Sequence, residues 1–483
     1  MNKKNTFLSE WCSEHNYTQK ELTALFNGKL SRPTISRILN NQRQLTSDEF
    51  KILKEKLQLS PEELRRFEKE YTKSVIGEDR YKCRKIIQHI LRLSSDNVIF
   101  RVNTLLNTEI TNYLLDLLHS INSGNRKESL YTNLPGDNCY ILYNALKAYP
   151  NVKNLEKIIH VVRLETKQNA SGGYSSSLHN MQILECVLQI ALVSSVYSPR
   201  YTYIDSEKES VCYHLYPYYI FCSSHLLLFN QALTDCITIT DSGIIHKFLR
   251  EFLEKFNSRT YLEFFKRKSN IVELIDDILT NNIESMPNVF FSNAPCIGKL
   301  LAFSQEYVKI KKEFQEKYQE CIHTINSCST LFKQLTLAYP NHIDILSENG
   351  LIDFVHNGYF EGILRIPFED STLLTRKQML KNMKQYIAKS PESHILIKQE
   401  HGIGKAFILE MYNKERGITL YFFGESNNLF SLTITEPSIY CEFENFMSNI
   451  SSIYEIYSPE EIGGVFDKYI SWLDEQIKMS EQV

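Results

Sequence analysis

The sequence has no pair of cysteines at the Cys-x-x-Cys spacing that marks many zinc sites and redox motifs. Its 11 cysteines are scattered along 483 residues, and an odd number does not suit a framework of paired disulfides. We therefore expect reduced, mostly buried thiols in a cytoplasmic protein.

Long apolar runs are also lacking. No stretch of about 18 consecutive apolar residues occurs, so the sequence predicts no membrane-spanning helix and no membrane partner. The first residues, Met1–Thr6, lead directly into an amphipathic segment without the apolar core of a secretory signal. Both absences favour a cytoplasmic location.

The sequence contains no recognisable catalytic constellation. HExxH and GxSxG are absent, and the segment Gly402–Lys405 is too short for a phosphate-binding loop. Cys212, His214, Cys222 and His225 form the best candidate metal cluster, but alternate residues of adjoining strands share a face in any case, which favours core packing. We therefore expect no enzyme activity, no cofactor and no metal.

A strong charge of one sign is missing as well, because 54 Lys and Arg side chains are balanced by 57 Asp and Glu side chains. The distribution along the chain is uneven, however, and residues 1–59 carry ten Lys or Arg against six Asp or Glu. A local excess of positive charge suits a surface that contacts nucleic-acid phosphates.

Three helix-capping motifs lie within or directly after this basic segment. Thr18, Thr46 and Ser60 are each followed three residues later by a glutamate, so hydroxyl and carboxylate can both accept hydrogen bonds from backbone N–H groups at a helix start. With the helical periodicity that follows each motif, the pattern predicts five helices, at about residues 6–15, 18–27, 31–40, 46–57 and 60–73. The residues expected to form their common core are Phe7, Leu8, Trp11, Leu22, Leu25, Phe26, Ile35, Ile38, Leu39, Phe50, Leu53 and Leu57.

The segment from Thr18 to Arg43 resembles the lambda-repressor/Cro, or XRE, class of helix-turn-helix domains. The matching residues are Thr18-Gln19-x-Glu21-Leu22, Ser31-Arg32-x-Thr34-Ile35-Ser36-Arg37-Ile38 and Asn40-Asn41-Gln42-Arg43. The resemblance implies a transcription regulator that binds a double-stranded DNA operator and uses the third helix for recognition. This chain departs from the family in its turn, Asn27–Leu30, which is longer than usual.

The resemblance also implies roles for single residues. Base edges would be read by Arg32, Ser36 and Arg37, since arginine can pair in bidentate fashion with guanine. Pro33 has no N–H to donate and would make at most an apolar contact with a thymine methyl group. Phosphates would be held by Gln19, Thr34, Asn40 and Arg43. In the alternative interpretation, Arg32 and Arg37 are ordinary solvated helix residues.

The fold class predicted for the whole chain is α+β and predominantly helical. A five-helix helix-turn-helix domain at residues 1–75 precedes a helical region at 76–200 and a first β-β-α module at 201–260. A second helical region at 261–390 contains a long helix at about 299–338, and a second β-β-α module with a C-terminal helix fills 391–483. The two modules are predicted because Ile237–Phe248 aligns without gaps on Leu432–Phe443, at an offset of 195 residues. In this alignment Asp241 matches Glu436, and both are expected to cap the start of a helix. Phe248 and Phe443 are expected to occupy equivalent core sites.

The region from about 210 to 460 also looks like the large C-terminal part of Firmicute regulators with such heads, which brings no established ligand with it. We expect this region to form a homodimer, to sense a small-molecule or peptide effector, or both. The candidate pocket lining is an aromatic run, although ring packing in a core is the favoured explanation of that run: Tyr213, Tyr216, Tyr218, Tyr219 and Phe221.

Two other functions remain open at this point. The chain could be a peptide-pheromone receptor that also binds DNA, although no clear 34-residue helical repeat is visible in its middle region. Alternatively, the long region could be a phage-defence or interaction effector whose DNA-binding head serves only for autoregulation.

Overall fold

The structure is a computed structural model in which two compact units are distinguished, at residues 1–85 and 86–483. It describes residues 6–93, 108–149, 152–166, 175–203, 215–258, 260–268, 287–292, 312, 342–358, 371–398, 407–423 and 429–481.

The first unit is helical, and its helices begin where the capping motifs predict. In α2, α4 and α5, the hydroxyl of Thr18, Thr46 or Ser60 accepts from the third helical backbone N–H, and the glutamate there accepts in return from the cap residue's N–H. The helices are α1 (Phe7–Glu14), α2 (Gln19–Leu25), α3 (Arg32–Leu39), α4 (Ser47–Lys56), α5 (Pro61–Ile76) and α6 (Glu78–Ile90). The predicted five-helix domain is wrong in extent, because the compact unit reaches Lys85 and so includes most of α6.

One apolar core holds α1 to α5 together, and it contains all the residues predicted for it. Leu25, Leu39 and Phe50 are only partly buried, whereas the other predicted core residues are buried. Phe67 of α5 joins this core, where its ring packs against the rings of Phe7 and Phe50.

The second unit is built on two seven-stranded mixed sheets. The first sheet has the order β6-β5-β4-β1-β2-β3-β7, in which β1, β2 and β3 run parallel and all other neighbours pair antiparallel. Its strands are β1 (Glu128–Thr132), β2 (Leu155–Leu164), β3 (Tyr197–Tyr203), β4 (Tyr218–Phe221), β5 (Leu226–Phe229), β6 (Cys236–Ile239) and β7 (Leu262–Glu263).

The second sheet repeats this arrangement. Its order is β11-β10-β9-β12-β13-β14-β8, in which β9, β10 and β11 are parallel and the other neighbours antiparallel. In both sheets, three parallel strands (the parallel trio) are followed in the chain by three antiparallel strands. The first of these antiparallel strands pairs with the free side of the first parallel strand, and the other two continue outward from it. The strands are β8 (Lys266–Lys268), β9 (Val289–Ser292), β10 (Ile343–Ser347), β11 (His394–Ile397), β12 (Phe407–Met411), β13 (Ile418–Phe423) and β14 (Leu429–Ile434).

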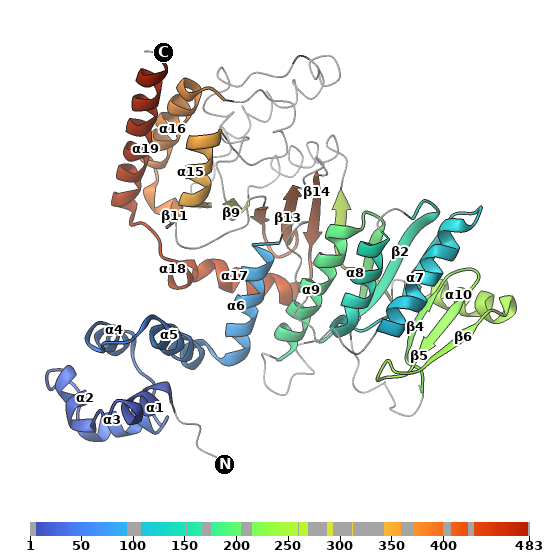
Figure 1. The fold of residues 1–483 in the computed structure, drawn as a ribbon, viewed down its shortest axis with the longest axis horizontal. Coiled ribbons are helices and arrows are strands. Elements are labelled where there is room, and N and C mark those ends of the chain that lie inside the picture. The colour runs from blue at the N-terminus through green and yellow to red at the C-terminus, as the bar shows by residue number, and fades with distance from the viewer. Residues whose placement is uncertain are drawn as a thin grey trace. The chain divides into compact units, whose positions relative to one another are not determined.

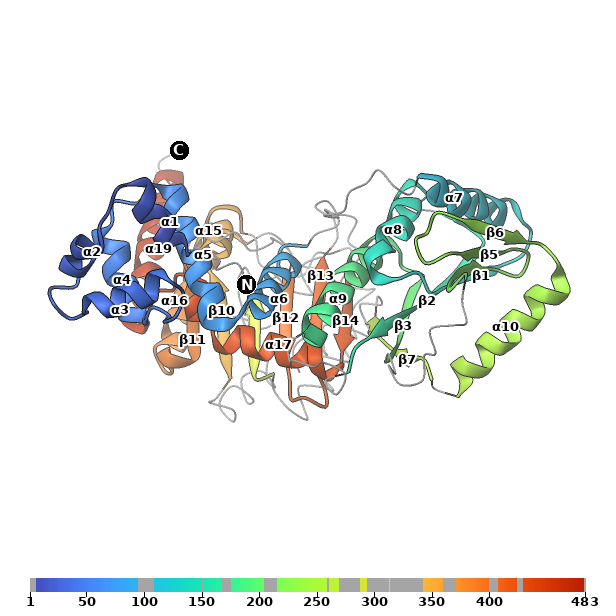
Figure 2. The same cartoon turned by 90° about the horizontal axis from the view of Figure 1, so that it is seen from below.

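Helices cover the faces of both sheets. Figure 2 shows α7 and α8 on one side of β1 and β2 and α10 on the other. Figure 1 shows α15, α16 and α19 grouped beside β11, where they share an apolar core with the second sheet. The helices of this unit are α7 (Thr108–Ser123), α8 (Cys139–Ala148), α9 (Ser175–Val193), α10 (Ser242–Asn257), α15 (Glu348–Asn357), α16 (Leu373–Ile387), α17 (Pro437–Ser448), α18 (Ile450–Ile453) and α19 (Pro459–Ser480), with 3-10 turns at Gly136–Asn138 and Pro391–Ser393.

The predicted fold class is therefore wrong. Regions assigned to helices contain the central strands β1, β2, β3, β9 and β10. A strand that is covered on both faces needs no alternation of polar and apolar residues, so its sequence resembles a buried helix segment. In β2 the five consecutive residues Ile158–Val162 are all buried, which removes the period of two that would have marked a strand. The predicted long helix at 299–338 lies outside the described residues, apart from residue 312.

The two predicted β-β-α modules are not the architectural units of the fold either. Each is the final part of a larger unit that begins with the parallel trio. The offset of 195 residues nevertheless places Asp241 on Glu436, and both carboxylates cap a helix. The backbone N–H of Ile244 donates to Asp241 over 2.9 Å, and that of Ile439 donates to Glu436 over 2.8 Å.

Buried polar contacts join the two sheets. Glu436 is 3% exposed and accepts hydrogen bonds from the hydroxyl of Tyr203, at the end of β3, and from that of Ser438. The amide of Asn180 in α9 donates to Ser438 over 2.9 Å, so α9 of the first half is tied to α17 of the second. The Arg267 guanidinium in β8 donates to the carbonyl of Ala191 at the end of α9 over 2.7 Å.

Candidate nucleic-acid interface

The turn between α2 and α3 depends on residues that tolerate a left-handed backbone. After α2 ends at Leu25, Asn27 and Gly28 adopt φ angles of 50° and 80°. A Cβ atom at Gly28 would meet no atom within 4 Å, so glycine is favoured there by its backbone conformation and not by lack of space. These two residues redirect the chain into the start of α3.

The phase of α3 separates an anchored face from an exposed one. Ile35 and Ile38 are 2% and 4% exposed and lie in the core of the first unit. Arg32, Pro33 and Arg37 are exposed, while Ser36 is half-buried. Within the described residues, no ion pair or hydrogen bond engages the Arg32 or Arg37 guanidinium. Both cations are therefore available to a ligand on this face.

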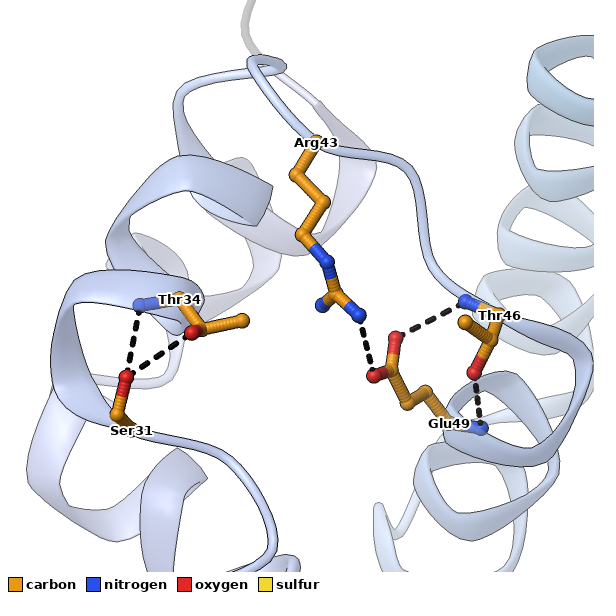
Figure 3. A network of polar contacts seen from close by, with 5 residues as sticks. All are labelled: Ser31, Thr34, Arg43, Thr46 and Glu49. Atoms are coloured by element: carbon orange, nitrogen blue, oxygen red, sulfur yellow. Dashed lines mark hydrogen bonds and ion pairs between the residues drawn. The ribbon is translucent and has the colours of Figure 1, made fainter.

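Polar side chains at the two ends of α3 are engaged within the helix itself. Figure 3 shows Ser31 at the N-terminus, where its Oγ lies 2.9 Å from Thr34 Oγ1 and accepts from the Thr34 backbone N–H. At the other end, Asn40 Nδ2 donates to the carbonyl of Ser36 over 2.8 Å. These bonds fix the helix ends and leave Asn40 Oδ1 as an exposed acceptor.

Arg43, predicted as a phosphate contact, forms an ion pair within the first unit. Its guanidinium donates to Glu49 Oε1 over 2.7 Å, and Glu49 Oε2 accepts the backbone N–H of Thr46 over 2.9 Å (Figure 3). Burial acts to raise the pKa of the Glu49 carboxyl, but the Arg43 and Thr46 hydrogen bonds outweigh it and hold that pKa below its usual value. Arg43 thus joins the segment after α3 to the start of α4. The Thr46-x-x-Glu49 capping motif marks Glu49 as a helix cap but does not identify Arg43 as its partner.

Gln19 and Lys29 are two further exposed polar residues near α3. Gln19 is the first residue of α2 and is exposed, as a phosphate contact at a helix N-terminus requires. Lys29 lies in the turn, is exposed, and forms no ion pair within residues 6–93. The sequence analysis gave Lys29 no role.

The charge of the chain is divided between the two units. Residues 1–85 contain 18 Lys or Arg and 12 Asp or Glu, whereas the remaining residues contain 36 and 45. In the first unit, Arg66 pairs with Glu10, and Lys54 pairs with Glu68 over 2.7 Å. The Arg32 and Arg37 cations carry no such neutralising partner among the described residues.

The aromatic run predicted as a pocket lining is divided between the faces of the first sheet. Tyr219 and Phe221 pack edge-on against Phe248 of α10, with ring centroids 5.2 and 5.1 Å apart. Tyr218 is one residue away in β4 and therefore belongs to the opposite face. Burial raises the pKa of the Tyr219 hydroxyl well above its usual value. Tyr216 precedes β4, and Tyr213 lies outside the described residues, so no common pocket lining is formed by the described members.

The cysteine and histidine cluster does not assemble within the described residues either. Cys222 and His225 flank the tight β4–β5 hairpin, where the Cys222 backbone N–H donates to the His225 carbonyl over 2.9 Å. Cys212 and His214 lie outside the described residues, as does Gly402–Lys405. The described part of the chain brings no three His, Cys, Asp or Glu side chains into a group that could hold a metal ion.

One buried histidine has a structural explanation. His160 in β2 is fully buried, with Nδ1 2.8 Å from the Tyr197 hydroxyl and Nε2 2.7 Å from the Leu134 carbonyl. Burial lowers the pKa of this imidazole to about 4, although the hydrogen bond to Leu134 opposes the change. A neutral imidazole with both ring nitrogens occupied ties β2 to its neighbours and has no atom left for a ligand.

Comparison with known proteins identifies no family. No family model matches the sequence, and no curated protein matches it. Among solved structures, the chain is similar to the phosphatidylserine synthase of Haemophilus influenzae Rd KW20, with 10% identity and a TM-score of 0.22 over 82% of this chain and 99% of that one. A TM-score this low supports no argument. Among the described helices, none has the length and apolar character needed to cross a bilayer.

Proposed function

We propose that residues 1–85 bind double-stranded DNA through α3 and that the protein is a cytoplasmic transcription regulator. α3 would lie in the major groove with its first turns against the base edges, as recognition helices of helix-turn-helix proteins do. Arg32 and Arg37 would read bases, with Ser36 between them. Gln19, Lys29 and Asn40 would contact phosphates.

The observation that carries this proposal is the exposed face of α3. Ile35 and Ile38 fix the helix in the core, and the rotation that buries them presents Arg32 and Arg37 to solvent. Base reading requires donors held on a rigid element without competing partners. The excess of positive charge in residues 1–85 supports attraction to a polyanion.

Residues 86–483 would bring two heads together. One head offers few phosphate contacts, and helix-turn-helix dimers bind half-sites one helical turn apart. This part of the chain carries more acidic than basic residues, so it would not add to the attraction for DNA. We therefore expect a homodimer and a pseudo-palindromic operator.

The test begins with the full-length protein, crosslinked in cells and purified so that the bound DNA can be sequenced. On the operator found in this way, Arg37→Ala should lose about 1–3 kcal/mol of binding free energy and relax selectivity at one base pair. Lys29→Ala should weaken binding to operator and random DNA alike. The slope of log affinity against log salt concentration should fall by about 1, as expected for the loss of one phosphate contact.

Lys69→Ala is the matched control, because Lys69 is an exposed lysine of α5 and lies outside the helix-turn-helix. It removes the same charge and should leave operator selectivity unchanged. Equal losses for Arg37→Ala on operator and random DNA would show that Arg37 is a phosphate contact. A purified protein without enriched DNA, and without measurable affinity for any duplex at low salt, would refute the proposed function.

A further inference from the structure

The edges of the two sheets differ in how they are protected against pairing with another chain. Among the described strands, β7 is only two residues long, and its Glu263 pairs with Arg200 over 3.6 Å. β8 consists of the three basic residues Lys266–Lys268. Short edges and edge lysines are recognised devices that prevent edge-to-edge association.

The edge at β11 is covered by the chain itself. Lys398 donates its backbone N–H to the Glu455 carbonyl, and Tyr457 donates to the Leu396 carbonyl, both over 2.9 Å. An isolated bridge between Ile397 and Ile456 lies between these two bonds. Three of the four edges in the described sheets are thus short, charged or covered.

The remaining edge, β6, carries none of these protections. Its sequence, Cys236–Ile239, has no charge and no proline. Ile237 is 41% exposed and Thr238 is also exposed, and no described strand pairs with the outer side of β6. Ile244, the third residue of the helix that follows β6, α10, is 51% exposed.

The second sheet shows how the equivalent edge is completed. At the offset of 195 residues, Cys236, Ile237 and Thr238 correspond to Ser431, Leu432 and Thr433 of β14. These three residues of β14 pair antiparallel with β8. In the first sheet, no described strand occupies the corresponding position beside β6, and the additional strand β7 pairs instead with β3 at the opposite edge.

The backbone of β6 offers hydrogen-bonding groups on this open side. Asn230 donates its N–H to the Asp235 carbonyl over 3.2 Å at the β5–β6 hairpin. In an antiparallel ladder the bonded residues alternate, so Ile237 and Ile239 bond to β5. The N–H and C=O groups of Cys236 and Thr238 therefore point away from the sheet, spaced to accept an antiparallel strand.

We propose that β6 pairs antiparallel with the β6 strand of a second copy of this chain. A two-fold axis through Ile237 would set Cys236 opposite Thr238 in both directions, so that both outward pairs are satisfied. The two Ile237 side chains would meet on the axis as a non-hydrogen-bonded pair, with their Cβ atoms close together. This proposal assigns the interface of the expected homodimer to the residues of β6. It depends on the geometry of β6 and not on the DNA-binding proposal.

A second copy fits this edge better than an unrelated peptide. The strand is its own complement, because it is uncharged and self-pairing about Ile237 opposes no two like charges within Cys236–Ile239. An edge that recruits a charged peptide would be expected to carry the opposite charge beside it. Self-pairing would also cover the exposed Ile237 of both copies.

The test measures the mass of the full-length protein by light scattering and sedimentation at micromolar concentration. The unmodified chain should be a dimer. Thr238→Pro should yield a folded monomer, because proline removes an outward N–H and spares the bonds to β5. Ile237→Lys should do the same by placing two ammonium groups opposite each other. Leu374→Lys is the control, since Leu374 is 64% exposed in α16 and should leave the dimer intact.

A positive test uses crosslinking. Ile237→Cys should form an intermolecular disulfide on treatment with the thiol oxidant diamide, because the paired Cβ atoms fall within disulfide range. Leu374→Cys and the unmodified chain should not crosslink in this way. A monomeric native chain, a dimer that survives both β6 substitutions with unchanged circular dichroism, or a stoichiometric foreign partner in its place would overturn the proposal. A dimer without DNA affinity would refute only the proposed function.

Discussion

Arg43→Ala separates the two roles considered for this residue, a phosphate contact and an internal ion pair. In the structure, the Arg43 guanidinium bonds to Glu49 Oε1 over 2.7 Å. Glu49 is only 8% exposed, and it also caps Thr46 at the start of α4. Removal of the guanidinium leaves a buried carboxylate with one fewer donor, so the helical unit should lose stability whether or not DNA is present.

The expected loss is about 1–3 kcal/mol of unfolding free energy. Fully exposed ion pairs contribute at most about 1 kcal/mol, and breaking a fully buried pair costs about 3–5 kcal/mol. The side chains of Arg43 and Glu49 are 33% and 11% exposed, which places this pair between the two limits. A hydrogen bond to a charged group is worth about 1.5–3 kcal/mol, in agreement with that range.

The assay can report on the first unit alone. The chain contains two tryptophans, Trp11 in α1 and Trp472 in α19. In a Trp472→Phe background, fluorescence of the buried Trp11 follows unfolding of the helical unit in urea. Arg43→Ala should shift that transition to a lower urea concentration. Glu49→Gln should also lower the stability of the unit, but it should have little further effect when Arg43 is already alanine.

The pH dependence gives a second measure of the same pair. The pKa of Glu49 is lowered in the folded state, so its contribution is present above the unfolded pKa of about 4.3 and is lost as the pH falls through the folded value. Glu49→Gln should reduce this loss of stability at acid pH. Unchanged stability in Arg43→Ala, together with weaker DNA binding, would refute the assignment and restore Arg43 as a phosphate contact.

Three further predictions concern stability. His160 has a pKa lowered to about 4, so the second unit should lose stability as the pH falls from about 6.5 to 4, and His160→Gln should remove that slope in pH-dependent urea titrations. Phe443→Ala should cost about 3–5 kcal/mol because Phe443 is fully buried, whereas Phe248→Ala should cost clearly less because α10 leaves that ring half-buried; equal losses by chemical denaturation would contradict this difference. Gly28→Ala should destabilise the first unit by about 1–2 kcal/mol through its φ of 80°, as measured by Trp11 fluorescence, and Gly28→Asn should lose less because asparagine tolerates the left-handed region; a neutral alanine would show that the turn rearranges.

The local features of the first unit were predictable because they depend on residues close together in the sequence. A hydroxyl and a glutamate three residues apart define a helix start without help from the rest of the chain. The spacing of Ile35 and Ile38 likewise set which face of α3 is exposed. The partner of Arg43 was not predicted, because the choice between a phosphate and Glu49 depends on how α3 and α4 are arranged.

The two sheets were predicted mainly in their meandering, antiparallel parts. The meandering strands β4 to β6 and β12 to β14, together with the helices that follow them, are visible from turns and β-branched residues. The parallel strands β1, β2, β3, β9 and β10 were missed, and in β2 the run of buried residues Ile158–Val162 lacks the alternation that marks a strand. The equivalence of Phe248 and Phe443 was likewise only partial, since α17 packs on α9 and buries more of its residues than α10 does.

The sequence by itself determined where helices begin, which residues form the helical core, and that Asp241 and Glu436 each cap a helix. These properties follow from hydrogen bonds and periodicities that span only a few residues. The tertiary structure decided that Glu436 is also buried against Tyr203 while Asp241 stays exposed, and that β14 is covered by β8 while β6 remains an edge. Such differences arise from contacts between segments hundreds of residues apart, which a local repeat of sequence cannot specify.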